Sequence, residues 1–399
     1  MSSKPALRGL MLGRLVATHH VSGAVSPWDP FIDGSQATMS SGTLATVRPS
    51  TFRSPFLRAR ACMLRFLGAF SAAMLAIALP ASAQEATFKG KTLEILVGFG
   101  PGGGYDAYAR VLGEFLGRHL PGAPTVLVRN MPGAGSLTVV NHIAASAPKT
   151  GLTIATFDPA QMIAPLLGEK NANFDASQLT WVGSMASSTN VCISWVGSDV
   201  KGWDDMFNRR EPAPMGTTGP ADARYQHTAI LRNMLGANLK IIPGYKGSSE
   251  VRLAMERGEI AGNCGDSWSS LKSTAPDWLK QKKINLLAQF AVAAHPELAG
   301  VPLIMDHAKN DLDRAALRLL LGPQVAGRPF IAPPGVSPSI IKALRDGFDA
   351  ALRDPDLVAR AGKLDLEIEP VSGVKIEALV RDLYKTPSSA IDAAKAAIR

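Results

Sequence analysis

The stretch TLEILVGFGPGGGYD, residues 92–106, decides the fold of this 399-residue chain. Its first part, 92–97, is a short apolar run, which is typical of a buried strand. A loop with five glycines follows, and apolar residues then recur at helical spacing from 106 to 120. Glycines let the backbone approach a ligand closely, and free N–H groups at a helix start favour an anion. We therefore predict a ligand-binding loop here, because five glycines exceed the needs of a plain tight turn, which is the alternative.

The same alternation continues beyond this stretch. Strands predicted at 125–128 and 152–157, with a helix at 136–147, extend it to β-α-β-α-β, the pattern of a parallel sheet with helices on its faces. Further strands are predicted at 181–183, 191–196, 239–242, 260–264 and 284–291, and further helices at 224–235, 250–257, 339–352 and 378–397, the last with a break at Pro387. A second small-residue loop at 216–220 also precedes a helix. Two such units predict two lobes with facing loops.

The first 83 residues are expected to lie outside this fold. Residues 63–83 combine a basic start, an apolar run of 14 residues and an Ala-x-Ala end, the pattern of a secretory signal peptide. We expect translation to begin at Met63, with 1–62 as a disordered upstream extension. The alternative is a genuine N-terminal tail before a buried helix.

Composition and charge exclude several classes of protein. Hydrophobic residues make up 46% and charged residues 19%, which excludes wholesale disorder and a coiled coil. No apolar run reaches the roughly 18 residues of a membrane span. The net charge of +9 invites a nucleic-acid interpretation, but residues 1–83 hold eight basic and two acidic residues, which leaves a net +3 in 84–399. We therefore expect no nucleic-acid partner, and the mild positive balance fits a small anion.

Two cysteines, Cys192 and Cys264, follow the signal peptide, both in apolar, strand-like contexts. An exported protein could join them in a disulfide. We favour buried free thiols, because so large a body needs no covalent staple. The chain has no Cys-x-x-Cys and no histidine cluster, so we predict no metal site.

The first glycine loop also matches G-x-G-x-x-G, a dinucleotide-binding pattern, at Gly98, Gly100 and Gly103. The acidic residue expected after the second strand is absent, since 129–130 is Arg-Asn, and Pro101 stiffens the loop. We therefore predict no cofactor.

Catalytic motifs are scarce. Residues 133–136 have the wrong spacing for a G-x-S-x-G nucleophile elbow, and the chain contains neither H-E-x-x-H nor a P-loop. His119, His142 and His227 lie in helical stretches, as ordinary histidines do. We predict that the protein is not an enzyme, with an exported α/β enzyme such as a hydrolase as the alternative.

Candidate ligand contacts lie in the loops that follow predicted strands. Ser136 suits a helix N-cap or a ligand contact, and Asp158 suits a ligand contact or, as we favour, a turn. Thr217 and Thr218 offer hydroxyls to a carboxylate, whereas solvated surface is the default for Lys246. The predicted ligand-binding set is Phe99, Gly100, Gly102, Gly103, Gly104, Tyr105, Asp106, Ser136, Asp158, Thr217, Thr218, Gly219, Lys246 and Asp266.

Six segments of the chain form a recognisable set through their order and spacing: 98–106, 130–136, 147–151, 216–219, 242–247 and 331–337. In these segments the chain resembles the extracytoplasmic solute receptors of tripartite tricarboxylate transporters, the TctC/Bug family. The resemblance implies an α/β, two-lobed periplasmic binding protein of type II-like fold, each lobe a mostly parallel sheet flanked by helices, with a ligand cleft between the lobes. It places lobe 1 at 84–188 and 288–399 and lobe 2 at 189–287.

The resemblance also implies a function. A small carboxylate, such as a di- or tricarboxylate, would be held by backbone amides, hydroxyls and bridging water, with the loop ending in Asp106 at one end and Thr217 and Thr218 at the other. The closed periplasmic protein, expected to be a monomer, would deliver it to membrane permease subunits; a ligand sensor for a membrane receptor is a further alternative. Many family members begin the first loop with Pro-Pro-Gly-Gly, whereas this chain has Gly-Pro-Gly-Gly-Gly at 100–104 and then the bulky Tyr105, so the identity of the ligand does not transfer.

Overall fold

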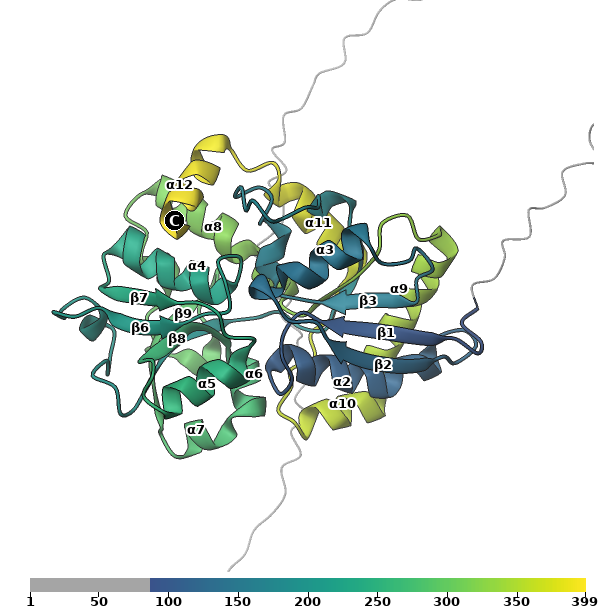
Figure 1. The fold of residues 1–399 in the computed structure, drawn as a ribbon, viewed down its shortest axis with the longest axis horizontal. Helices are drawn as coiled ribbons and strands as arrows, with labels where there is room; N and C mark the ends of the chain where they lie inside the picture. Colours follow the sequence, from purple (N-terminus) through teal and green to yellow (C-terminus); the bar gives the residue numbers. More distant parts are fainter. Residues whose placement is uncertain (1–86) are drawn as a thin grey trace, which may run out of the picture. The chain divides into compact units, whose positions relative to one another are not determined.

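The structure is a computed structural model that describes residues 87–399. The upstream extension expected at 1–62 and the signal peptide expected at 63–83 lie outside the described residues. Among residues 87–399, no helix has both the length and the apolar character needed to cross a membrane. The described residues form two β-sheets with helices packed on both faces of each (Figure 1).

The first sheet begins with the predicted β-α-β-α-β unit. Its parallel strands are β1 (Thr92–Val97), β2 (Thr125–Asn130) and β3 (Thr153–Thr156). Helices α2 (Gly104–Leu116) and α3 (Leu137–Ala145) connect them. Neighbouring parallel strands require such crossover connections. The predicted β-α-β-α-β order of this segment is confirmed.

Three later strands complete the first sheet, and every pair that they form is antiparallel. They are β4 (Thr180–Ser184), β10 (Pro329–Ala332) and β11 (Val371–Ser372), and the strand order is β11-β4-β10-β3-β1-β2. Strand β10 enters between β3 and β4, so a segment from late in the chain lies in the middle of the sheet.

Helices cover both faces of the first sheet. Helices α2, α9 (Pro338–Leu352) and α10 (Pro355–Gly362) bury one face of the sheet. The side chain of Leu93 in β1 lies on this face. Helices α3 and α11 (Gly373–Leu383) bury the other face, on which Leu96 points. Because side chains alternate along a strand, a nearly continuous apolar run such as β1 suits a sheet that is covered on both sides.

The second sheet has the strand order β7-β6-β8-β5-β9. Strand β6 is parallel to β7 and β8, and β5 is antiparallel to β8 and β9. Its strands are β5 (Asn190–Trp195), β6 (Ala213–Gly216), β7 (Leu239–Ile242), β8 (Gly262–Ser267) and β9 (Ile284–Phe290). Its helices are α4 (Ala223–Ile230, followed by the π-helical turn Leu231–Leu235), α5 (Ser248–Glu256), α6 (Trp268–Thr274) and α7 (Pro276–Lys280).

The two-lobed α/β expectation agrees with these two sheets, but both sheets are mixed rather than mostly parallel. Strands β10 and β11 run against β3 and β4, and β5 runs against both of its neighbours. The parallel pairs are confined to the consecutive β-α-β units. The strands near the places where the chain passes from one sheet to the other are the antiparallel ones.

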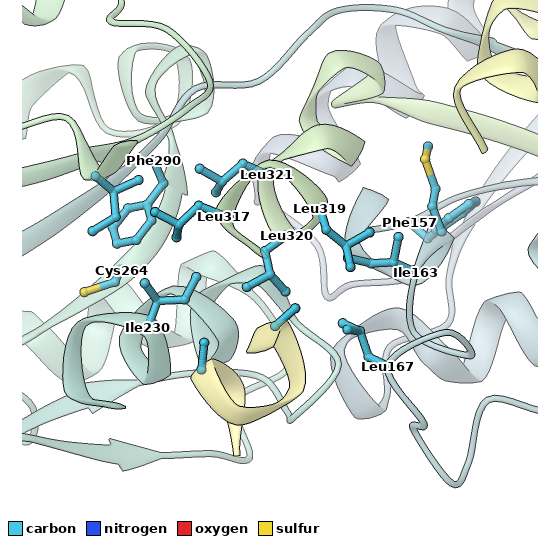
Figure 2. Packing of buried hydrophobic residues seen from close by; sticks show 14 of the residues in the cluster. Phe157, Ile163, Leu167, Ile230, Cys264, Phe290, Leu317, Leu319, Leu320 and Leu321 are labelled. Carbon is cyan, nitrogen blue, oxygen red and sulfur yellow. The ribbon is translucent and has the colours of Figure 1, made fainter. Parts of the chain in front are cut away.

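Helix α8 (Asp311–Leu321) joins the hydrophobic cores of the two sheets. Figure 2 shows Leu317 and Leu321 on the side of Phe290, from the second sheet, and Leu319 on the side of Phe157, from the first. The C-terminal helix α12 (Ser388–Ile398) packs on α8 and α4 through a row of alanines. One apolar cluster therefore runs continuously from one sheet to the other.

Cys192 of β5 and Cys264 of β8 form a disulfide. The register of the antiparallel pair places the two residues directly opposite each other. The expectation of buried free thiols is therefore wrong. The pairing of β5 with β8 places the two sulfurs next to each other, whether or not the fold requires a covalent cross-link.

Candidate functional site

Loops at the carboxyl ends of parallel strands in both sheets meet one another. The backbone N–H of Gly100, after β1, donates to the carbonyl of Lys246, after β7, at 2.9 Å. The Ser249 hydroxyl donates to the Pro101 carbonyl at 2.9 Å. A Cβ at Gly219 would lie only 3.2 Å from the backbone of Ala134. The two groups of loops therefore face each other, as the sequence predicted, and the glycines permit close contacts between their backbones.

A small enclosed cavity of about 10 Å³ lies among these loops, with room for about one water molecule. Three of the predicted residues, Gly104, Tyr105 and Asp158, line it. The sequence did not predict the remaining lining residues, which are Asn190, Arg224, Ser248, Gly265, Ser267, Ser270 and Arg328. The first sheet and its helices contribute Gly104, Tyr105, Asp158 and Arg328, and the others come from the second.

Arg328 is the most unusual of the lining residues, because its guanidinium is buried and has no acidic partner. It immediately precedes β10, is 2% exposed, and donates to the Ser270 hydroxyl at 2.6 Å and to the Gly327 carbonyl at 2.7 Å. Its guanidinium carbon lies 4.7 Å from the ring centre of Tyr105 and 4.9 Å from that of Tyr108. Among residues 87–399, no carboxylate forms an ion pair with it, and its Nε has no hydrogen-bond partner.

Arg224, by contrast, belongs to a paired cluster. It lies 2.9 Å from Asp266 and 3.5 Å from Asp222, and Arg252 lies 3.1 Å from Asp266. Burial by itself would raise the pKa of Asp266, but the charges of Arg252 and Arg224 outweigh burial and lower this pKa to about 2. Two arginines and two aspartates thus neutralise each other beside the cavity.

Asp158 is the second charged residue of the cavity that lacks an ionic partner. It is 3% exposed, and its carboxylate accepts from the backbone N–H groups of Ala160 at 2.9 Å and Ala223 at 3.3 Å. No basic side chain in the described part of the chain forms an ion pair with it. Burial, followed by the nearby charge of Asp222, raises the pKa of Asp158 to about 7.

The other predicted residues of the first glycine loop build the loop rather than line the cavity. Phe99 stacks on Tyr105, with ring centres 4.7 Å apart. Gly102 has a positive φ of 80°, and its N–H donates to Asp106 at 2.9 Å. The carboxylate of Asp106 is paired with Arg110 at 2.8 Å. Gly103 lies against Ser248 of the second sheet.

Predicted residues in the later loops also hold the loops in place. Ser136 makes no side-chain cap, and its hydroxyl instead accepts from the backbone N–H of Asp158 at 3.0 Å. Thr218 donates to Asp222 at 2.5 Å, while the buried hydroxyl of Thr217 has no hydrogen-bond partner among residues 87–399. Lys246 is exposed. Asp266 is buried in its ion pairs.

One signal in the sequence could have identified Arg328. It is a lone charge in the apolar segment VAGRPFIA at 325–332, which leads into a buried strand. A charge there is either paired or functional. Arg224 and the serines carry no such local signal, because their positions depend on contacts between distant parts of the chain.

Comparison with known sequences identifies a family and a relative of the chain. The sequence model described as "Tripartite tricarboxylate transporter family receptor", TctC, matches residues 108–394. The "UPF0065 protein in gbd 5'region" of Cupriavidus necator is 25% identical over 306 residues, covering 75% of this chain and 86% of the relative.

Three solved structures are similar in fold to this chain. The periplasmic binding protein BugD matches with a TM-score of 0.63 and 20% identity, covering 77% of this chain and 98% of that one. MatC from Rhodopseudomonas palustris, with bound malate, matches with a TM-score of 0.59 and 18% identity, covering 76% of this chain and 98% of that one. A second R. palustris protein, with adipate, matches with a TM-score of 0.58 and 19% identity, covering 75% of this chain and 97% of that one. These matches confirm the predicted periplasmic-binding-protein fold. Because the family model covers most of the sequence, the chain belongs to the TctC family of tripartite tricarboxylate transporter receptors, which are periplasmic solute-binding proteins.

Proposed function

We propose that this protein captures a small carboxylate between its two lobes in the periplasm and delivers it to membrane permease subunits. Lobe 1 comprises 84–188 and 288–399, and lobe 2 comprises 189–287. The division of the strands supports this assignment, since those of the first sheet fall within 92–184 and 329–372 and those of the second begin at 190. The last strand of the second sheet, β9, ends at Phe290, three residues past the boundary at 287. Helices α8 and α12 belong to lobe 1 by sequence but pack across the boundary.

The uncompensated charge of Arg328 is the observation that carries the carboxylate proposal. An unpaired charge removed from water costs several kcal/mol, and a carboxylate on the flat guanidinium would offset that cost. Arg224 and Arg252 are already neutralised by Asp222 and Asp266. The two tyrosine rings hold the Arg328 guanidinium in place, so little side-chain freedom remains to be lost on binding.

The small volume of the cavity implies a mechanism. An acid of four or six carbons, such as the malate and adipate held by the two R. palustris proteins, enters only when the loops separate. The lobes then close on it, and closure is favoured by contacts that the ligand makes with both sides. The hydroxyls of Ser248, Ser267 and Ser270 supply lobe 2 contacts.

Calorimetry and thermal denaturation with acetate, succinate, adipate, malate and citrate test the proposal. At least one acid should bind the wild-type protein, and Arg328→Gln should weaken that binding at least tenfold. Arg381→Gln, at an exposed position on α11, is the matched control and should bind normally. Arg328→Lys keeps the charge without the planar fork and should bind at an intermediate level. No binding of any acid to the wild-type protein contradicts the proposal.

Delivery has its own experiment. Cells that lack the protein should lose uptake of the bound acid, and wild-type protein should restore this uptake. Arg328→Gln should not restore it. Uptake that is unaffected by loss of the protein contradicts the transport role.

A further inference from the structure

The cavity carries two opposite charges that the protein leaves unpaired. Among the described residues, neither Arg328 nor Asp158 forms an ion pair, although both are buried and line the same cavity. The other charges beside it, on Arg224, Arg252, Asp222 and Asp266, cancel in their mutual ion pairs. Within the described part of the chain, the cavity therefore offers one unpaired guanidinium and one unpaired carboxyl group.

Strand pairing explains why these two residues share the cavity. Strands β3 and β10 are antiparallel, and Thr156 pairs with Phe330. This register, if continued two residues past the last recorded pair, would place Asp158 opposite Arg328. Residues two apart on a strand point to the same face, so both side chains leave the end of the ladder in the same direction. Tyr105, whose pKa both of them influence, lies close to each.

Within residues 87–399, the surroundings of Asp158 provide no positive charge that is not already paired with another carboxylate. The charged and titratable groups that face it are Asp222 and Arg224, at the start of α4, and Tyr105, on α2. Asp222 is a like charge in close proximity, and Arg224 is already shared between Asp222 and Asp266. The backbone N–H groups of Ala160 and Ala223 occupy only part of its acceptor capacity.

We infer that the ligand is an amino-carboxylate zwitterion, with its carboxylate on Arg328 and its ammonium group on Asp158. This inference rests on the proposed function and makes it more specific. A plain dicarboxylate would bring two negative charges to one free cation and would place the second beside Asp158 and Asp222. An ammonium group would instead separate the charge of Asp158 from that of Asp222. The three serine hydroxyls accept or donate hydrogen bonds with either end of such a ligand.

Matched pairs of acids that differ only by an amino group test the inference. The pairs are succinate and aspartate, glutarate and glutamate, and propionate and alanine, each titrated calorimetrically into the wild-type protein at pH 7. In at least one pair the amino acid should bind at least tenfold more tightly than the plain acid. Asp158→Asn should reduce that ratio to about one, whereas Asp311→Asn, an exposed control on α8, should preserve it.

Proton exchange provides a measurement that needs no variant. Asp158 is about half protonated at pH 7, so an ammonium group beside it should release protons on binding. A plain acid should instead take protons up. Calorimetric titration in two buffers of different ionisation enthalpy shows directly whether protons are released or taken up on binding.

The outcomes separate this inference from the proposed function. If plain acids bind and no amino acid binds more tightly than its partner, the zwitterion inference is overturned and the carboxylate proposal stands. Proton uptake on binding of an amino acid also overturns the inference. If no member of any pair binds, the inference fails. The proposed function fails with it only when acetate, adipate, malate and citrate do not bind either.

Discussion

The side-chain amide of Gln161 donates a hydrogen bond to the carbonyl oxygen of Ala221 at 2.8 Å, across the junction between the two sheets. The same Nε2 donates to the carbonyl of Gly135 at 2.9 Å, and the side chain is fully buried. One amide therefore ties a loop of the first sheet to the loop before α4.

Gln161→Leu should weaken ligand binding about tenfold. The substitution leaves two buried carbonyls without their donor, at a cost of about 1–2 kcal/mol to the closed arrangement. Calorimetry with the acid that binds the wild-type protein best measures the effect. Gln178→Leu, at an exposed position, is the matched control. Unchanged affinity in Gln161→Leu would show that this bridge does not contribute to closure.

Gly104→Ala should prevent the loops from closing. A Cβ at this position would lie 1.8 Å from the Ser270 hydroxyl and 2.5 Å from its Cβ. We expect binding to fall at least tenfold, and the double variant Gly104→Ala, Ser270→Gly to recover part of the loss. The recovery is limited because Ser270 also accepts from Arg328. Wild-type affinity in Gly104→Ala alone contradicts the closed contact seen here.

The stability of the folded protein should depend on pH through Asp158. Its folded-state pKa is raised to about 7 from an ordinary value of 3.8, so the protonated form is the one that stabilises the fold. This stabilisation is complete below about pH 4 and is lost as the pH rises toward 7, by about 1 kcal/mol per pH unit. Above pH 7.5 it should change no further.

Chemical unfolding of wild type and Asp158→Asn from pH 4.5 to pH 8 measures this dependence. The variant cannot ionise, so the wild type should lose stability relative to it over that window. A constant difference between the two proteins across the window contradicts the assignment.

Asp266→Asn should destabilise the fold by about 3–5 kcal/mol, because it leaves Arg224 and Arg252 buried without their shared carboxylate. Urea unfolding gives the free energy. Asp199→Asn removes an ion pair whose carboxylate is largely exposed, with Arg209, and should cost less than about 1 kcal/mol. Equal effects of the two substitutions would mean that the buried cluster adds nothing beyond a surface pair.

The disulfide between Cys192 and Cys264 should be intact in protein isolated without reductant, so neither thiol should be alkylated after denaturation. Peptide mass mapping detects the linked pair. The double variant Cys192→Ala, Cys264→Ala should lose about 2–4 kcal/mol, since the bond constrains a long loop of the unfolded chain. Alkylation of both residues without reductant contradicts this bond.

The first sheet was predictable because its signals are local. Apolar runs such as 92–97 end in glycines, and the helices between them have regular spacing. Helix α8 was not predicted, although its segment has a good N-cap in Asn310 and apolar residues on one face. The mixed sheets were not predictable, because the position of β10 between β3 and β4 depends on pairing over more than 140 residues.

The candidate site was predictable only in outline. The glycine loops indicated where the two groups of loops would meet. Local spacing could have shown that Asp106 is paired, because Arg110 lies four residues later on the same helix. Nothing local could show that Ser270 would meet Arg328, or that Asp222 would lie beside Asp158. The charges that decide ligand chemistry are thus set by tertiary contacts.

Helix α8 has a consequence for how the protein can be divided. Its leucines serve both halves, with Leu317 and Leu321 beside Phe290 and Leu319 beside Phe157 (Figure 2). Neither half therefore has a complete hydrophobic core of its own. A fragment that contains only one sheet would expose apolar residues that are buried against the other half. Heat should melt the molecule in a single cooperative step, and separately expressed halves should be insoluble apart and regain structure only on mixing.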